Sequence, residues 1–263
     1  FTQDTHIASR LTGTNNLYTN TTAAEVNQVE NVWDFMDGWG GWTVTNTDNR
    51  AWNFKRATGF MDVVAYTGNG TTPRNITHNL GAVPEFIVTK RRDAVGAWPV
   101  YNPDLGITST SAIRLNTNDG SGYSQLSRYP STPTSTVFTV GNDSDLNASA
   151  GTYVSYLFST VAGVSKVGSY TGTAATLNVD CGFTAGARFI LIKRTDSAGD
   201  WYTWDSVRGI SAGNDPYLLL NDEAVEVTGT DYVDPLNAGF TVTSNASSTV
   251  NVNGGTYIFL AIA

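Results

Sequence analysis

The 263-residue chain is poor in charged side chains, in histidine and in cysteine. Charged residues make up 14% of it, against roughly 25% in an average globular protein, so its polar surface must come mainly from Thr, Ser, Asn and Gly. Its single cysteine, Cys181, cannot form an internal disulfide, and its two histidines have no cysteine cluster beside them that would make a zinc site. The sequence therefore predicts no metal centre and no cofactor.

Positive charge and long apolar runs are also scarce. Lys and Arg together number 15 against 23 Asp and Glu, which gives a net charge of −8. A chain of that sign repels phosphate groups, so we expect no nucleic-acid binding. The longest apolar run, at residues 257–263, is far shorter than the roughly 20 residues that a membrane-spanning helix needs. We therefore expect no membrane insertion.

Aromatic residues, at 11% of the chain, are abundant enough to exclude a disordered protein. One aromatic-flanked stretch occurs twice, as FIVTKRRDAVGAW at Phe86–Trp98 and as FILIKRTDSAGDW at Phe189–Trp201, 103 positions apart (189 − 86). Each copy opens with a continuous apolar, β-branched run, which is typical of a strand buried on both faces. An Asp-x-x-Gly turn follows the run. The stretch therefore predicts a β-hairpin with a buried first strand, present twice.

Shorter matches extend the repeat on both sides. Phe138-Thr139-Val140 matches Phe240-Thr241-Val242 at an offset of 102 (240 − 138), and the other matches drift by a few residues, as insertions in loops would cause. We predict an all-β fold of tandem antiparallel β-sandwich (jelly-roll-like) repeats of about 103 residues. The repeats are residues 58–163 and 164–263, and residues 1–57 are the diverged back half of an incomplete first copy.

The last repeat is expected to contain seven strands, and the chain one helix. The helix is predicted at Thr22–Trp33, where Thr22 and Glu25 have the spacing of a capping box, with a weaker twin at Glu223–Asp231. The seven predicted strands are Val167–Tyr170, Thr176–Cys181, Phe189–Lys193, Trp201–Trp204, Tyr217–Leu220, Phe240–Thr243 and Thr256–Ala263.

An incomplete first copy would expose apolar side chains. Residues 1–57 supply back-half strands but no partner for a buried central strand, which would leave Trp33, Phe35, Trp39 and Trp42 uncovered. The chain begins with Phe1 rather than Met, as a processed or shortened polypeptide would. We therefore expect these aromatic side chains to pack against another chain or against protein upstream of Phe1. This favours a homo-oligomer, and by analogy with fibre proteins a trimer.

Four aromatic residues lie at or just after the repeated turn, and two interpretations of them stay open. Trp98, Tyr101, Trp201 and Trp204 could form an exposed platform on which a neutral glycan stacks beside Asn and Asp side chains. The alternative is that they belong to the core, which is favoured for Trp98 and Trp201 because both repeats keep that Trp. Trp204 is freer to be a platform, since Tyr101 stands at its equivalent position.

No group of residues indicates catalysis. His6 and His78 lie in different repeats, and neither stands in a nucleophile-elbow setting. Most Asp residues lie in Gly/Asn/Ser-rich turns, where they cap their own backbone. Asn142, Asp143 and Asp145 come nearest to a Ca²⁺-binding cluster, but they lack EF-hand spacing, so a plain turn is favoured. We predict no catalytic and no metal-binding residue.

Three motifs carry a resemblance to a known family. They are GFMDVVAYTG at residues 59–68, HNLGAVPE at residues 78–85 and AGVSKVGSYTG at residues 162–172. Together they resemble a domain found in tandem in virion proteins of marine tailed bacteriophages. The similarity is good over residues 59–263 and weaker before them, where the truncated first copy departs from the pattern. It implies a tail-fibre-like or other structural protein of the particle that also contacts the host surface, and it transfers no functional residue.

Three functions are consistent with these observations. The leading hypothesis is a virion structural protein (a tail fibre, appendage or decoration), located on the virion or outside the cell, with other copies or other virion proteins as partners. The second is a carbohydrate-binding module for a cell-surface glycan. A glycan depolymerase is less favoured, and it would require two carboxylates roughly 5–10 Å apart in a cleft.

Overall fold

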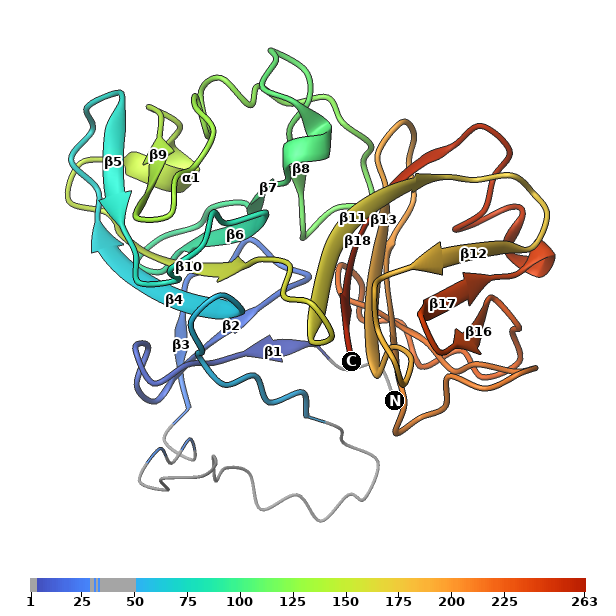
Figure 1. Cartoon of the computed structure of the whole chain (residues 1–263). Helices are drawn as coiled ribbons and strands as arrows, with labels where there is room; N and C mark the ends of the chain where they lie inside the picture. The colour runs from blue at the N-terminus through green and yellow to red at the C-terminus, as the bar shows by residue number, and fades with distance from the viewer. Residues whose placement is uncertain (1–3, 29–30, 32, 34–50) are drawn as a thin grey trace.

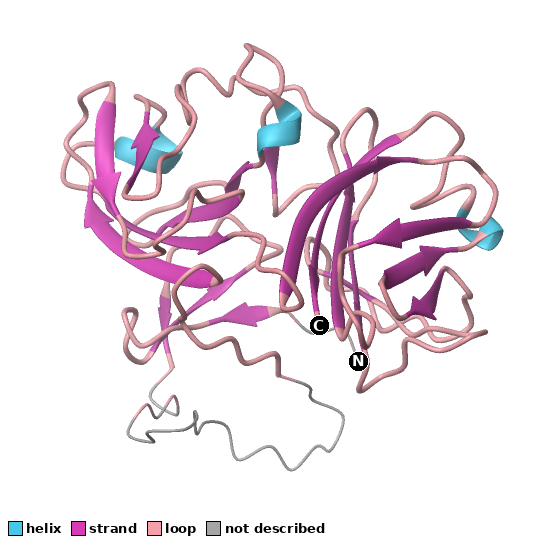
Figure 2. Cartoon of the chain, in the orientation of Figure 1, coloured by secondary structure: helices cyan, strands magenta, loops and turns pink. Residues whose placement is uncertain are grey.

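The computed structural model describes residues 4–28, 31, 33 and 51–263. Strands and loops make up nearly all of the described chain (Figure 2). Its only helical turns are the 3₁₀ turns η1 (Pro103–Leu105) and η2 (Ser244–Ala246) and the short α1 (Ser144–Asn147), within the described residues. Two β-sandwiches lie side by side, and strands of the N-terminal segment lie against them (Figure 1). The predicted all-β fold of antiparallel sandwich repeats is confirmed.

The first sandwich consists of a five-stranded sheet and a two-stranded sheet. In the larger sheet the strand order is β4-β10-β6-β7-β8, so β6 is central, and every pairing is antiparallel. The smaller sheet pairs β5 with β9. The strands are β4 (Met61–Thr67), β5 (Arg74–Thr77), β6 (Phe86–Arg91), β7 (Pro99–Tyr101), β8 (Ile113–Arg114), β9 (Val137–Val140) and β10 (Thr152–Phe158).

The second sandwich repeats the same arrangement. Its five-stranded sheet has the order β11-β18-β13-β14-β15, with β13 at the centre where the first sandwich has β6. Its smaller sheet, β12-β17-β16, has one strand more. The strands are β11 (Ser165–Thr171), β12 (Leu177–Asp180), β13 (Phe189–Arg194), β14 (Trp201–Asp205), β15 (Leu218–Leu219), β16 (Val233–Leu236), β17 (Gly239–Val242) and β18 (Thr256–Ile262). All seven strands predicted for this repeat are present, and β16 was missed.

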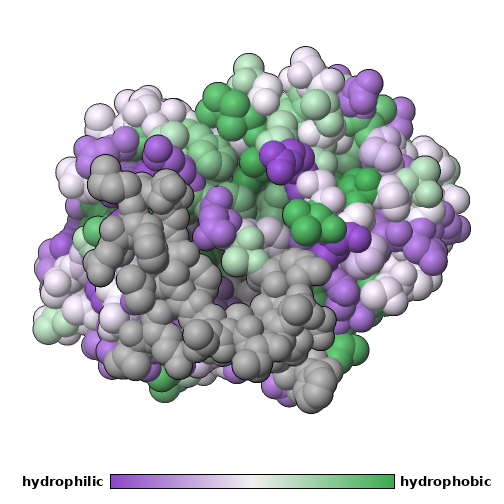
Figure 3. Space-filling view, turned by 90° about the horizontal axis from the view of Figure 1, so that it is seen from below, coloured by the Kyte–Doolittle hydropathy of each residue, from purple (hydrophilic) through white to green (hydrophobic). Residues whose placement is uncertain are grey.

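The central strands are apolar on both faces because each lies between two cores. Along β13, Ile190 and Ile192 point into the core between the two sheets of the second sandwich. Phe189 and Leu191 point the other way, into a core that both sandwiches share with the N-terminal segment. Seen from below, apolar residues gather near the middle of the visible face, where the two sandwiches adjoin (Figure 3). The large sheets are therefore the inner layers of one continuous body.

The N-terminal segment adds the three-stranded sheet β1 (His6–Ile7), β2 (Asn15–Tyr18) and β3 (Val26–Asn27). Its β1–β2 pair has hydrogen bonding equivalent to that of β7–β8 and β14–β15. The N–H of Thr19 donates to the carbonyl of Thr5 at 3.0 Å, as Leu115 does to Trp98 at 2.8 Å. The third equivalent bond joins Leu220 to Trp201 at 3.0 Å. The segment thus repeats the back-half strand pair of the sandwiches.

The predicted helix at Thr22–Trp33 is wrong in the part that the structure describes. Residues 22–28 contain no helical turn and include β3, because the Glu25 side chain and the Thr22 backbone bind the first sandwich instead. The Glu25 carboxylate pairs with Arg92 at 2.8 Å, and the carbonyl of Thr22 accepts from Lys90 Nζ at 3.1 Å. The weaker twin at Glu223–Asp231 is not helical either.

The expectation that Trp33, Phe35, Trp39 and Trp42 pack against another chain stays a prediction, but other apolar side chains of the N-terminal segment are covered within the chain. Leu17 is fully buried in the shared core, and the Trp52 and Phe54 rings pack edge-on against Phe189 at 5.7 and 5.4 Å. The chain's own sandwiches therefore cover this part of the segment. Trp33 is partly buried, and its Nε1 donates to the carbonyl of Gly13 at 2.7 Å. The other three aromatic residues of that prediction, Phe35, Trp39 and Trp42, lie outside the described residues.

The position of Trp52–Phe54 in the repeat follows from the turn after it. An isolated bridge joins Ala57 to Met61, and the equivalent bridge of the next copy joins Val161 to Ser165, 104 positions later (161 − 57). Phe54 therefore corresponds to Phe158, the last residue of β10, and the two rings lie 6.0 Å apart in the shared core. Residues 52–54 themselves form no strand.

Candidate functional site

The four aromatic residues of the predicted glycan platform are all buried. Trp98 and Trp204 are 0% exposed, Trp201 is 1% exposed and Tyr101 is 2% exposed. A sugar ring needs an open aromatic face to stack on, and none of these rings offers one. The platform hypothesis is therefore wrong at these four positions, and the core interpretation holds.

Trp98 and Trp201 instead join each repeat to the one before it. The indole Nε1 of Trp201 donates to the carbonyl of Arg114, in the first sandwich, at 2.9 Å. The indole Nε1 of Trp98 donates to the carbonyl of Tyr18, in the N-terminal segment, at 3.1 Å, and to that of Thr21 at 3.0 Å. Tyr18 stands before Thr19 as Arg114 stands before Leu115, the residues with equivalent strand bonds. The same joint therefore occurs twice along the chain.

A buried lysine completes each joint. Lys193 Nζ donates to the carbonyls of Asn118, from the preceding sandwich, at 3.1 Å and of Gly199 at 2.5 Å. Lys90 Nζ makes the equivalent bonds to Thr22 at 3.1 Å and to Gly96 at 3.0 Å. Both side chains are 0% exposed, and burial lowers the pKa of each amino group to about 8. The Lys and Trp of the repeated hairpin thus form a clamp on the neighbouring repeat.

Tyr101 and Trp204 lie on the opposite face of the same strands, inside the sandwiches. Tyr101 packs edge-on against Tyr129 at 5.7 Å in the core of the first sandwich. Trp204 stacks on Tyr202 at 5.8 Å in the core of the second sandwich. Tyr101 and Trp204 therefore occupy equivalent positions in the two repeats, each inside the core of its own sandwich.

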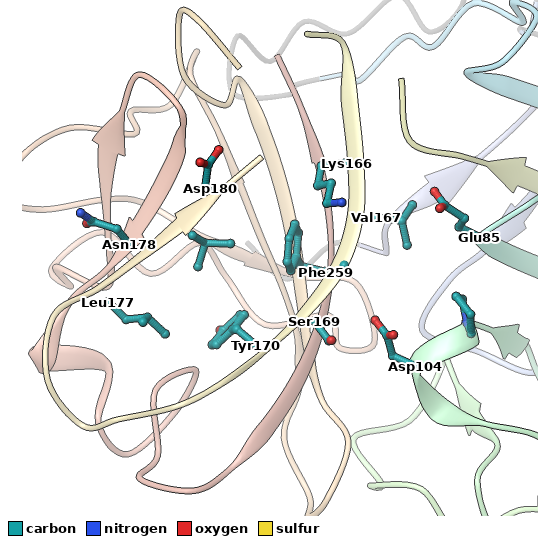
Figure 4. A pocket seen from close by; sticks show the side chains of 13 residues that line it. Glu85, Asp104, Lys166, Val167, Ser169, Tyr170, Leu177, Asn178, Asp180 and Phe259 are labelled. Carbon is teal, nitrogen blue, oxygen red and sulfur yellow. The ribbon is translucent and has the colours of Figure 1, made fainter. Parts of the chain in front are cut away.

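A groove of about 510 Å³ lies where the two sandwiches meet. The first sandwich contributes Glu85 and Asp104 to it, and the second contributes side chains of β11, β12 and β18 (Figure 4). Asp104 lies in η1, and Lys166 and Ser169 lie on β11. The remaining lining residues are Pro103, Val167, Gly168, Tyr170, Leu177, Asn178, Val179, Asp180 and Phe259. Sequence reasoning missed this groove because its two walls belong to different repeats.

Several polar groups of the groove are held in place by the backbone. Glu85 Oε2 accepts from the N–H of Thr160 at 2.6 Å, and Asp180 Oδ1 accepts from the N–H of Gly182 at 2.8 Å. Within the described part of the chain, Lys166 and Asp104 form no ion pair. The lining therefore combines three carboxylates with one amine.

Gly168 shapes the β11 wall of the groove. A Cβ at this position would lie 2.9 Å from Cζ of Phe259, which is closer than real Cβ atoms approach a neighbour. The bare backbone of Gly168 thus lets the aromatic ring of β18 pack beside the edge strand β11, leaving the groove open at that point. Any side chain there would displace the ring or fill the groove.

The turn that came nearest to a Ca²⁺-binding loop is satisfied by the protein itself. Arg128, 3% exposed, pairs with Asp143 at 3.1 Å and lies 3.7 Å from Asp145. Asp143 also caps the N–H of Asp145 at 2.9 Å, and Asp145 accepts from the N–H of Ala97 at 2.9 Å. The plain-turn interpretation is therefore supported. A second acidic group, Asp215, Asp231 and Asp234 in the other sandwich, has no such arginine among the described residues.

Comparison with known proteins assigns the chain to a family but not to a function. A model of a domain of unknown function (DUF7483) matches residues 12–263, so the chain belongs to that family. No curated protein and no solved structure matches the chain. No helix of the described residues is long and apolar enough to cross a membrane.

Proposed function

We propose that this member of a family without an assigned function is a non-catalytic structural protein of a bacteriophage particle, as a tail fibre, an appendage or a decoration. The identification with phage rests on the three sequence motifs that resemble tandem domains of marine phage virion proteins. The structural role rests mainly on one observation: the same buried Lys–Trp clamp joins the N-terminal segment to the first sandwich and the first sandwich to the second.

The clamp supports a structural role because it makes the repeats one stiff body. A buried amino group loses its hydration, and only well-placed acceptors offset that cost. In this chain one of the two carbonyl acceptors of each lysine belongs to the preceding repeat, so the clamp is complete only in one relative placement of neighbours. The shared core, which contains residues of both sandwiches and of the N-terminal segment, adds to this stiffness. A stack of repeats joined in this way transmits force rather than bending at linkers.

The proposal includes partners and a location. Repeat proteins that serve as fibres or appendages act as assemblies, so we infer that the chain works on the virion as a homo-oligomer, with a trimer favoured, or in contact with other virion proteins. These inferences rest on analogy with fibre proteins. Size-exclusion chromatography with light scattering on the purified full chain tests the oligomer, and a monodisperse monomer at virion-like concentrations contradicts it.

The experiment that tests the virion role examines particles directly. Particles of the phage whose genome encodes this chain would be purified on a density gradient and analysed by quantitative mass spectrometry. We expect the chain in a fixed copy number per particle, and antibody against it should label a defined part of the particle in electron microscopy. Gradient-purified particles that contain no trace of the chain, while it is present in the lysate, would overturn the proposal.

A second candidate function, glycan binding, now depends on the groove rather than on the predicted platform. The groove offers hydrogen-bonding side chains from two sandwiches and the ring of Tyr170. We expect Lys166→Ala and Asp104→Ala to abolish any binding seen on an array of neutral bacterial glycans. Lys55→Ala, which removes an exposed lysine outside the groove, is the matched control. Equal binding by all variants would exclude the groove.

A glycan that binds on the array can then be used to distinguish binding from depolymerisation, the less favoured function. Glu85 and Asp180 are the carboxylates of the groove that accept backbone N–H bonds, which suits a positioning role better than proton transfer. We expect a bound glycan to keep its chain length, as measured by size-exclusion chromatography. Shortened products that disappear in Glu85→Gln would show that the groove is an active site.

A further inference from the structure

Three aspartates from separate parts of the second sandwich converge on one point. Asp215 lies in the loop between β14 and β15, Asp231 comes just before β16, and Asp234 lies within that strand. One carboxylate oxygen from each lies within 4.8 Å of one oxygen from each of the others. Side chains of like charge repel at this distance, and the repulsion is strong where water is excluded. Such an arrangement is stabilised by a proton or by a bound cation.

One carboxylate oxygen of each aspartate is buried and has no hydrogen-bond partner in the described part of the chain, although Asp231 and Asp234 are partly exposed as residues. Asp215 is 0% exposed, and its Oδ2 accepts from the N–H groups of Tyr232 and Val233 at 2.8 and 2.9 Å. Its Oδ1, like the Oδ1 atoms of Asp231 and Asp234, is inaccessible to solvent and has no hydrogen-bond partner in the described part of the chain. Ser211 N–H faces the Asp215 carboxylate, outside normal hydrogen-bond geometry. Buried oxygens without a partner are rare in proteins, because the oxygen loses its bonds to water and gains no hydrogen bond that offsets this loss.

The first sandwich has an acidic turn at a different place in the repeat, and an internal cation lies beside it. There Asp143 and Asp145 are close together, and the buried guanidinium of Arg128 lies between them at 3.1 and 3.7 Å. In the described residues no lysine or arginine pairs with any of the three aspartates of the second sandwich. The described residues therefore supply no positive charge to the cluster, which leaves room for a bound cation.

We propose that Asp215, Asp231 and Asp234 bind one divalent cation, with Ca²⁺ as the preferred ion. The ligand set consists of carboxylate oxygens without histidine or cysteine, which favours hard cations and disfavours zinc and copper. Two ligands on opposite sides of a Ca²⁺ ion, at about 2.4 Å from it, are about 4.8 Å apart. Three oxygens within that limit thus fit a single Ca²⁺ coordination shell, and further oxygens or water would complete the six to eight ligands that Ca²⁺ takes.

The ion would hold a long connection onto the smaller sheet. Residues 206–232 run from the end of β14 to the start of β16 with only β15 as a regular element. Asp215 comes from the middle of this stretch, whereas Asp231 and Asp234 lie at and beyond its end. A cation bound by all three ties the stretch to the edge of sheet β12-β17-β16. The site is independent of the groove and of the virion assignment.

The first experiment titrates the full chain, freed of metal with a chelator, with CaCl₂ and with MgCl₂ in a calorimeter. We expect one Ca²⁺ per chain with a dissociation constant on the order of 10⁻⁴ M or tighter, and weaker binding of Mg²⁺. Tb³⁺, a luminescent stand-in for Ca²⁺, should emit on excitation of the nearby Tyr232–Tyr217 pair, whose rings stack at 5.8 Å. Absence of saturable Ca²⁺ binding to the parent chain overturns the proposal.

Variants then locate the site. Asp234→Asn keeps the shape of a partly exposed ligand and should weaken Ca²⁺ binding roughly 10-fold or more, because affinity depends on the ligand charge count. Asp222→Asn, at an exposed aspartate of the same repeat, should bind as the parent does. If Asp234→Asn also binds like the parent, the ion lies elsewhere and the proposal fails.

Asp215→Asn adds a test that does not require binding to be measured. In excess chelator this variant should melt at a temperature equal to or above that of the parent, since it removes one of three repelling charges. On addition of Ca²⁺ the parent should gain several degrees and the variant almost none. Equal gains for parent and variant, or no gain for the parent, contradict the proposal. A variant that fails to fold in chelator would show a structural need for the charge and would also contradict it.

Discussion

Substituting Ile190 by alanine measures how much the second sandwich depends on its central strand. Ile190 is fully buried on β13 and packs into the core between the two sheets of its own sandwich. Alanine lacks three of its carbon atoms, and each buried methylene is worth about 0.8 kcal/mol, so the transfer term alone is about 2.4 kcal/mol. The cavity left between the two sheets adds to this cost. We expect the free energy of unfolding to fall by about 2–5 kcal/mol.

Its neighbour Phe189 provides the contrast, because it points to the other side of the same strand. Phe189 packs with Trp52, Phe54 and residues of both sandwiches in the shared core. Phe189→Ala should cost about 3–5 kcal/mol and should loosen the N-terminal segment and both sandwiches together. Ile190→Ala should act first on the second sandwich. The two substitutions therefore differ in where the damage appears.

Urea denaturation followed by tryptophan fluorescence gives the cost, and hydrogen exchange resolved by peptide gives its location. In Ile190→Ala, exchange should increase in β12, β17 and β18 while β5 and β9 keep their protection. In Phe189→Ala, residues 52–54 should lose protection as well. Ile87→Ala, the equivalent change in the first sandwich, is the matched control and should give the reverse pattern. A cost below about 1 kcal/mol for Ile190→Ala would refute the reasoning that both faces of this strand are packed.

Three further predictions concern the joints and the groove. Trp201→Phe leaves the buried carbonyl of Arg114 without its donor and should cost about 2–4 kcal/mol in urea denaturation, whereas Tyr202→Phe should cost less than half as much. Because burial lowers the pKa of Lys90 and Lys193 to about 8 in the folded chain, the unfolded chain binds more protons between pH 8 and 10, and the free energy of unfolding should rise over that range. The double variant Lys90→Met, Lys193→Met should lack this rise in denaturation curves at a series of pH values, and a parent whose stability is flat or falls from pH 8 to 10 would contradict the cause. Gly168→Ala should lower the melting temperature because its Cβ meets Phe259, while Gly229→Ala, with nothing within 4 Å of its Cβ, should not.

The strands could be predicted from the sequence because the large sheets are inner layers. A strand such as Phe189–Arg194, with a core on each face, has to be apolar throughout, and that signal is strong. Strand β16 was missed because Pro235 interrupts it, and proline normally argues against a strand. It is tolerated at this position because β16 is an edge strand, paired only with β17. The signal failed where the strand lies at the rim of a sheet.

Local patterns were misleading where the partner group comes from another repeat. Thr22 and Glu25 have the spacing of a helix cap, but their groups bind Lys90 and Arg92 of the first sandwich. From the sequence, Trp201 beside a polar turn could be a glycan platform. In the structure it is buried in the core that the repeats share, and its indole N–H donates to the carbonyl of Arg114 of the preceding repeat. Sequence spacing describes neighbours along one segment, so it cannot show which carbonyl of a distant segment a side chain meets.

The aspartate cluster shows the same limit most clearly. Asp215 stands 16 positions before Asp231 (231 − 215) and 19 before Asp234 (234 − 215), and no common calcium motif has that spacing. The acidic turn of the first sandwich is spanned by Arg128, whereas the three aspartates of the second sandwich come from other positions of the repeat and pair with no lysine or arginine among the described residues. Carboxylates that lie this close together are stabilised by solvent, by a shared proton or by a bound cation. Full burial removes solvent for Asp215. A single shared proton would neutralise one of the three carboxylates, whereas the proposed divalent ion would interact with all three.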